Sequence, residues 1–132
     1  MSDDVSREPL HRRPHPQPMA APFLEFDLGR ELDDLHREGG WKSGHNARTL
    51  VKFDDFRVVL IALASNTTIP GHRTDGRISI QTVRGHVRVR AEGRTFDLPA
   101  GALLALDHDL PHDVEALEES AFLLTIAWRP RG

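Results

Sequence analysis

The clearest structural signal in the chain is the stretch ISIQTVRGHVRVRAEGRTFDL, residues 78–98. In its middle, Val87 and Val89 alternate with one histidine and two arginines, which is the period-two pattern of a strand with one buried face. A Glu-Gly pair at positions 92 and 93 then interrupts the alternation, and such pairs favour tight turns that need positive φ. The stretch therefore predicts consecutive short strands joined by tight turns.

The same pattern recurs over most of the chain after Trp41. Short segments rich in Val, Ile, Leu, Thr and Phe are separated by acidic or glycine-containing pairs that suit turns. The predicted strands are Arg48–Phe53, Arg57–Ala64, Ile78–Val83, His86–Ala91, Arg94–Leu98, Leu103–Leu106, His112–Leu117 and Ala121–Trp128. Because no helical pattern of about ten residues separates them, parallel β-α-β units are excluded. The sequence therefore predicts an all-β fold, an antiparallel sandwich or barrel.

The beginning of the chain differs from this pattern. Residues 1–21 are rich in Pro, Arg, His and Asp and hold few apolar residues to bury, so we expect a disordered N-terminal tail. Asp27 can then cap a short helix in which leucines recur at positions 28, 32 and 35, and Gly39-Gly40 can end it. A narrow apolar face of this kind predicts a helix that docks on the sheet. Residues 22–132 are therefore one predicted domain.

Composition argues against several classes of partner. The formal net charge is −3, which provides no broad basic field for nucleic acid. A cationic row formed by Arg84, Arg88 and Arg90 lacks interleaved aromatic residues, so we predict a solvated sheet face. The chain has no cysteine, which removes thiolate chemistry and is compatible with a reducing compartment. Because no apolar run suits a signal peptide or a membrane span, we expect a cytoplasmic protein without nucleic-acid or membrane partners.

The residues around His72 resemble the first sequence motif of the cupins, a family of small jelly-roll barrels. In that motif a His-x-His pair is followed by a Glu and, further on, by a Gly. His72 matches the first histidine and Gly85 matches the closing glycine. Thr74 occupies the second histidine position and Ile78 the glutamate position. Asn66 stands at the opening glycine, a replacement that fits because Asn also adopts left-handed conformations.

The residues around His112 resemble the second cupin motif. Gly101 and His112 match its spacing. The motif's Pro, Gly and Asn are replaced by Asp107, Asp109 and Ala116. The resemblance covers about residues 60–128, and the chain is identified as a small single-domain cupin of the cupin 2 conserved-barrel type with degenerate metal-binding motifs. This implies an all-β double-stranded β-helix, a jelly-roll barrel, preceded by the short N-terminal helix.

The resemblance also locates a candidate site in the barrel interior. Positions two apart on a strand share a face, so His72, Thr74, Ile78, Ile80 and Thr82 should project to one side, with His112 pointing into the same cavity from the opposite sheet. The candidate ligand-binding residues are His72, Thr74, Ile78, Thr82 and His112. A buried histidine that bonds a backbone carbonyl is the structural alternative for the two imidazoles.

A complete metal cage is not predicted. Cupin enzymes hold their metal with three histidines and one glutamate, and catalytic zinc or iron sites ordinarily need at least three protein ligands. Only His72 and His112 can be placed here, because the Thr74 hydroxyl is neutral and Ile78 removes the anionic charge. We therefore expect no cofactor and no catalytic residue or, if a metal is bound, a divalent ion at His72 and His112.

Three functional hypotheses remain open. The leading one is a cupin-fold protein whose incomplete cage binds a small molecule in a sensing, carrier or regulatory role. The alternative is a metal-dependent cupin enzyme, a dioxygenase, isomerase or decarboxylase that uses His72 and His112; whether the protein is an enzyme is left undecided. The third is an interaction module that works as a homodimer, for which Arg48–Phe53 is a candidate edge strand.

Overall fold

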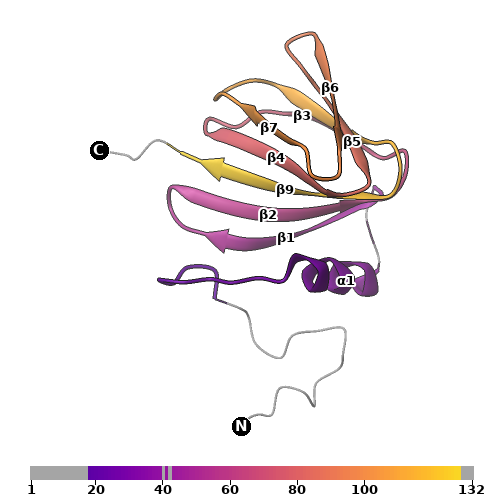
Figure 1. The fold of residues 1–132 in the computed structure, drawn as a ribbon. Helices are drawn as coiled ribbons and strands as arrows, with labels where there is room; N and C mark the ends of the chain where they lie inside the picture. Colours follow the sequence, from indigo (N-terminus) through magenta and orange to yellow (C-terminus); the bar gives the residue numbers. More distant parts are fainter. Residues whose placement is uncertain (1–17, 40, 42, 129–132) are drawn as a thin grey trace.

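The computed structural model describes residues 18–39, 41 and 43–128 of the 132-residue chain. Within this part, helix α1 (Leu28–Glu38) precedes nine strands: β1 (His45–Lys52), β2 (Phe56–Leu63), β3 (Thr68–His72), β4 (Arg77–Arg84), β5 (His86–Ala91), β6 (Arg94–Pro99), β7 (Leu103–Leu106), β8 (His112–Ala116) and β9 (Ser120–Ala127). The strands form one sheet in the order β1-β2-β9-β4-β7 and another in the order β3-β8-β5-β6 (Figure 1). Their pairings are antiparallel. The predicted all-β jelly roll is therefore confirmed.

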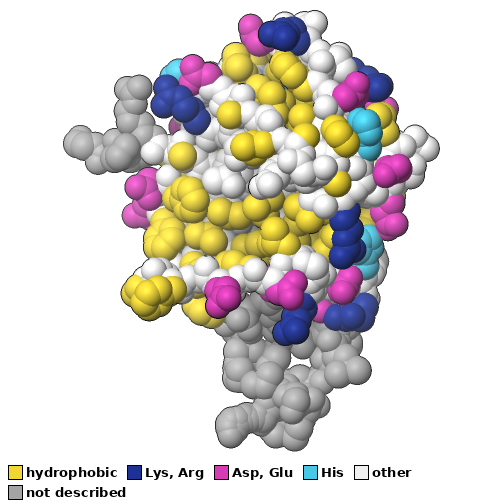
Figure 2. Space-filling view, viewed as in Figure 1, with side chains coloured by type: hydrophobic (Ala, Val, Ile, Leu, Met, Phe, Trp, Pro, Cys, Tyr) yellow, Lys and Arg dark blue, Asp and Glu magenta, His cyan; other side chains and the backbone are white. Residues whose placement is uncertain are grey.

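The two sheets face each other across an apolar core. The residues inside come from alternate positions of both sheets, for example Ile80 on β4 and Val87 and Val89 on β5, which are fully buried. Strands that are distant in sequence, such as β2 and β9, lie side by side. Figure 2 shows apolar side chains gathered in a band over β2 and β9, with charged side chains around it. The alternation seen in the sequence thus builds an apolar interior between the two sheets.

Helix α1 closes the outer face of the five-stranded sheet. The Asp27 carboxylate accepts a hydrogen bond from the backbone N–H of Arg30 at 3.2 Å, and Gly39, with φ of 63°, ends the helix. Leu32 and Leu35 are almost completely buried in a second core that includes Leu60. The predicted capped helix is therefore confirmed, although Gly40 lies outside the described residues. In the described part of the chain, no helix is long and apolar enough to cross a membrane.

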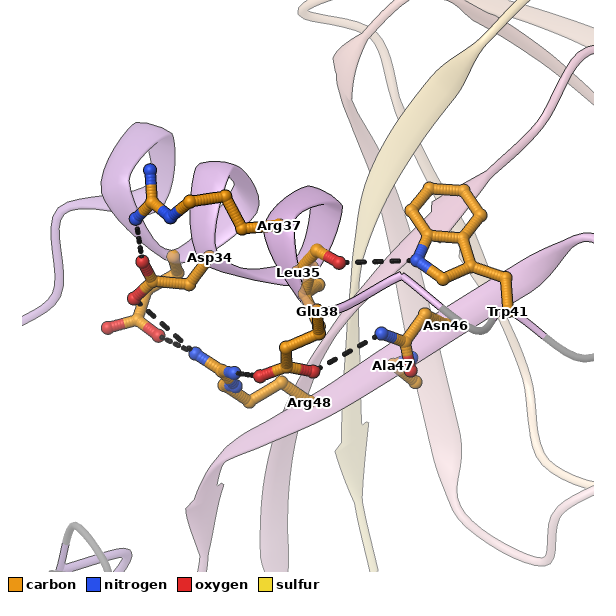
Figure 3. A network of polar contacts seen from close by, with 9 residues as sticks. Asp34, Leu35, Arg37, Glu38, Trp41, Asn46, Ala47 and Arg48 are labelled. Carbon is orange, nitrogen blue, oxygen red and sulfur yellow. Dashed lines mark hydrogen bonds and ion pairs between the residues drawn. The ribbon is translucent and has the colours of Figure 1, made fainter. Parts of the chain in front are cut away.

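Polar contacts fix α1 on the edge strand β1 (Figure 3). The Arg48 guanidinium lies 3.2 Å from a Glu31 carboxylate oxygen and 3.7 Å from one of Asp34, and it also donates to Glu38. Trp41 donates its indole N–H to a carbonyl of α1 at 3.2 Å. Arg48 and Glu31 are both mostly buried. The bonds between them therefore fix the orientation of α1 on the sheet and also stabilise its packing there.

Eight predicted strands correspond to observed ones, with ends that differ by a few residues. The prediction missed β3, which contains Pro70 and Gly71 and lies at the edge of the four-stranded sheet. An edge position tolerates proline because the missing N–H is not needed for pairing on that side. Of the predicted tail, residues 1–17 lie outside the described residues, and Met19 accepts a backbone hydrogen bond from Lys52 at 2.7 Å.

Of the predicted cationic row, Arg88 and Arg90 lie on the outer face of the four-stranded sheet and are matched by acids there, whereas Arg84 belongs to the five-stranded sheet. Arg88 donates to Asp97 at 2.8 Å, and Arg90 donates to Glu115 at 3.0 Å. The hydrogen bond from Arg88 holds the pKa of the Asp97 carboxyl below its usual value. Arg84, on β4, lies 3.9 Å from an Asp33 oxygen. The basic charge of the row is thus balanced locally by carboxylates.

Candidate functional site

A cavity of about 110 Å³ lies between the two sheets. Its wall combines residues from β2, β4 and β9 of one sheet with residues from β3 and β8 of the other, and with the loop between β3 and β4. The lining residues are Ile61, Ile69, Thr74, Ile78, Ile80, His112, Val114, Phe122 and Leu124. Three of the predicted site residues, Thr74, Ile78 and His112, therefore meet at one cavity.

The apolar part of the wall follows from strand alternation. Ile78 and Ile80, two positions apart on β4, are 5% and 0% exposed and point to the barrel interior. Across the sheet, Ile80 pairs with Leu124 on β9. Ile61 and Leu124 are only half-buried, so this part of the apolar wall is partly accessible from the surface. A molecule entering here meets hydrocarbon on most sides.

His112 is one of the two polar residues among the described side chains of the wall. It begins β8, is 8% exposed, and places its ring Nδ1 at 3.0 Å from the carbonyl oxygen of Leu110. Because a carbonyl can only accept, we assign a proton to Nδ1, which then donates to Leu110. The contact with Leu110 holds the orientation of the imidazole relative to the cavity.

Thr74 is the other polar residue on the wall. Its hydroxyl donates to the carbonyl oxygen of Gly76 at 3.2 Å, and its own carbonyl accepts from the backbone N–H of Asp109 at 2.8 Å. This second bond joins the loop after β3 to the loop before β8. The two polar wall residues, Thr74 and His112, are therefore held at the same end of the barrel.

Further contacts fasten the same two loops. The Asp107 carboxylate accepts from the backbone N–H of His108 and from the Arg77 guanidinium, both at 2.8 Å, and these bonds hold the pKa of Asp107 below its usual value. The indole of Trp128 donates to the Asp75 carboxylate at 2.7 Å. The polar end of the cavity is thus connected through Asp75 to the end of β9.

The structure corrects the expected placement of the two histidines. His72 ends β3 and is the direct register partner of His112 on β8, so both belong to the four-stranded sheet rather than to opposite sheets. The side chain of His72 lies outside the described part of the structure. Directly opposed positions of an antiparallel pair lie close together, so the two positions are neighbours across one ladder.

Thr82 is on the predicted face of β4 but has another partner. It is 1% exposed, and its hydroxyl donates to the carbonyl oxygen of Leu98 on β6 at 2.9 Å. It is absent from the residues that line the cavity. Sequence reasoning did not name the wall residues from β2, β3, β8 and β9, namely Ile61, Ile69, Val114, Phe122 and Leu124. The alternation within β9 could have indicated Phe122 and Leu124.

Among the lining side chains that the structure describes, the donors are one imidazole and one neutral hydroxyl, which do not fit a divalent metal ion by themselves. Ile78 places a hydrocarbon where the cupin motif has its carboxylate. Among the side chains that the structure describes, no group of three or more His, Cys, Asp or Glu is arranged to hold a metal. Catalytic zinc or iron sites ordinarily use at least three protein ligands.

One known protein family matches the region of the chain that contains the cavity. The family described as the AraC-like ligand binding domain matches residues 58–131, which is more than half of the chain and includes all the wall residues. No curated protein is significantly similar in sequence.

Solved structures show the same architecture. A cupin superfamily protein from Desulfitobacterium hafniense has a TM-score of 0.65 at 12% identity over 69% of this chain and 84% of its own. An RmlC-like cupin from Shewanella frigidimarina has a TM-score of 0.63 at 16% identity, over 68% and 81% of the respective chains. A mutant of salicylate 1,2-dioxygenase from Pseudoaminobacter salicylatoxidans has a TM-score of 0.64 at 19% identity, over 76% of this chain and 32% of its own. At these identities the likeness shows the cupin fold alone.

Proposed function

Because this chain belongs to the family of AraC-like ligand-binding domains, we propose that its cupin barrel binds a small molecule in a sensing, carrier or regulatory role. The observation that carries the proposal is the cavity between the sheets, whose lining residues, as far as the structure describes them, are apolar except for Thr74 and His112. Small-molecule sites are typically apolar pockets in which a few polar groups set the orientation of the ligand. We propose Thr74, Ile78 and His112 as direct contacts.

Two further predicted residues have different places in this proposal. We propose His72 as a further ligand contact, because its position is the register partner of His112. Thr82 supports the barrel next to the cavity through its hydrogen bond to Leu98.

The test is a thermal-unfolding screen with small carboxylic acids, sugars and aromatic acids. A ligand that binds the folded protein raises its unfolding temperature, and the rise should disappear in the His112→Ala variant. His108→Ala is the matched control, because the His108 side chain is 46% exposed in the neighbouring loop. A ligand-induced shift that survives in the double variant His72→Ala/His112→Ala would exclude the proposed site.

The same preparation tests the metal-dependent alternative. The proposal expects only trace metal in tag-free protein. Near-stoichiometric metal that is lost in His72→Ala would instead support a metal-dependent enzyme, with the further ligands supplied by residues beyond the described donors.

We also propose that the protein is a cytoplasmic homodimer. The strand expected at an edge, β1, is the outer strand of the five-stranded sheet, and an exposed strand edge favours pairing with a second chain. Lys52 at its end already donates its backbone N–H to Met19, which leaves the earlier part of β1 for the contact. Light scattering that shows a monomer would contradict the dimer, and cell fractionation tests the location.

A further inference from the structure

We propose that the cavity selects a compact, mainly apolar molecule with one polar end, on the scale of a branched-chain or single-ring acid, alcohol or amine, and discriminates against sugars. The inference rests on the proposed function and names the chemical class of its ligand. Three properties of the cavity support it: its volume, the composition of its wall and the position of its polar groups.

The volume limits the size of the buried part of the ligand. The cavity measures about 110 Å³, whereas pockets for larger ligands commonly measure about 300–1,000 Å³. An engineered apolar cavity of about 150 Å³ in another protein accepts benzene. A single ring or a short branched chain is therefore near the upper limit of what this barrel encloses, and any further atoms of the ligand would have to lie in the opening beside Ile61 and Leu124.

The wall argues against a polyhydroxylated ligand. Of the nine lining residues that the structure describes, seven have hydrocarbon side chains, and the Thr74 hydroxyl already donates to the Gly76 carbonyl. A sugar has four or five hydroxyl groups, most of which would lose water here without gaining a protein partner. Each polar group left unpaired weakens binding by about tenfold or more. An apolar molecule of the same size has no hydroxyl groups whose hydrogen bonds to water would be lost. It also gains burial against the isoleucine side chains of the wall.

The polar groups lie together, which sets the orientation of the ligand. The Asp109 N–H bonds the Thr74 carbonyl, and the contact between His112 and Leu110 belongs to the same pair of loops. Deeper in the barrel the wall consists of Ile80 and Phe122, which are almost completely buried. A ligand that matches both parts has one polar end directed at Thr74 and His112 and an apolar body directed at the core.

Calorimetric titration of the full-length, tag-free protein tests the inference with two sets of probes. The apolar set is isovaleric acid, benzyl alcohol and benzoic acid, and the polar set is L-arabinose, D-glucose and glycerol. We expect members of the apolar set to bind at least about tenfold more tightly than every member of the polar set.

Two variants place the binding in the cavity. Ile61→Trp and Leu124→Trp each fill the opening with an indole at a half-buried position, so folding is retained and can be confirmed by circular dichroism. Both should abolish binding of the apolar probes. Val58→Trp is the matched control, because Val58 is also half-buried on β2 but faces away from the barrel interior by strand alternation.

The outcomes separate the inference from the function on which it rests. Sugars that bind as tightly as the apolar probes, and that Ile61→Trp excludes, would overturn the ligand class and leave the proposed function intact. Failure of both sets to bind at millimolar concentration would overturn both. Apolar binding that persists in the two filled variants would overturn the assignment of the site to this cavity.

Discussion

Thr82→Val tests the physical reasoning about the barrel most directly. The Thr82 hydroxyl donates to the Leu98 carbonyl oxygen at 2.9 Å, and this bond joins β4 of one sheet to β6 of the other through the core. Valine has nearly the same shape as threonine, so the substitution removes the donor and creates no cavity. The carbonyl of Leu98, a residue that is itself 6% exposed, then loses this donor.

The magnitude follows from burial. Removing one partner of a buried hydrogen bond costs about 1–3 kcal/mol when the other partner stays buried. For a domain of this size, each kcal/mol corresponds to a fall in Tm of roughly 4 °C. Urea unfolding followed by circular dichroism should show a lower midpoint with an unchanged slope, because the same surface is exposed on unfolding.

The control is Thr125→Val on β9. Thr125 is half-exposed and pairs with Ser79 on the outer face of the sheet, so its substitution should change stability by no more than about 0.5 kcal/mol. The affinity for a cavity ligand should be the same in Thr82→Val and in the wild type. A Thr82→Val variant with wild-type stability would refute the inter-sheet role of Thr82. If its ligand affinity were altered as well, the result would favour Thr82 as a ligand contact.

Three other predictions test the turn geometry, the charged sheet face and the link between the cavity and β9. Gly93→Ala should cost about 1 kcal/mol because φ is 70° and nothing lies within 4 Å of an added Cβ. Gly85→Ala should cost clearly more in the same urea assay, because φ is 77° and the Cβ would lie 2.4 Å from a backbone carbonyl oxygen. The hydrogen bond from Arg88 lowers the folded-state pKa of Asp97 below the ordinary value of 3.8. The Arg88–Asp97 pair therefore stabilises the fold above that pH, and this stabilisation is lost as the pH falls through the lowered pKa. The slope of stability against pH below about pH 4 should therefore be flatter in Asp97→Asn, and an unchanged slope would contradict the pair's contribution. In a Trp41→Phe variant, whose remaining indole is that of Trp128, a cavity ligand should shift the fluorescence emission, because this indole is bonded to the loop that carries the polar wall. Emission that does not change while calorimetry shows binding would contradict this coupling.

The local elements could be predicted because their causes are local. Strand alternation located eight strands, and the Asp27 cap with three leucines located the helix. The left-handed position expected at Asn66 is also present, with φ of 67°. In β3 the local signal fails, because Pro70-Gly71 suggests a turn and only the edge position in the sheet makes a strand possible there.

The arrangement of the site could be predicted only in part. The motif spacing fixes Ile78 and His112 along their strands, and both line one cavity. Thr74 lines the same cavity from the loop between β3 and β4 and not from the expected strand face. The partnership of β3 with β8 was missed, because ladder pairing between segments far apart in sequence leaves no local pattern in either segment. For the same reason, the contributions of Ile61 and Phe122 to the wall became apparent only once the sheets were assembled.

At two of its metal-ligand positions, the cupin motif has a histidine and a glutamate where this chain has Thr74 and Ile78. Both of these residues belong to the wall of the cavity, and Ile78 is only 5% exposed. A carboxylate at that depth would be costly without a cation, because an isolated charge loses its hydration there. With isoleucine, the same position needs no cation and offers apolar contact to a ligand instead. The loss of the anionic metal ligand and the gain of an apolar wall are therefore one change. Under the proposed function, a barrel altered in this way would retain its ligand by burial, and His112 and Thr74 would orient it.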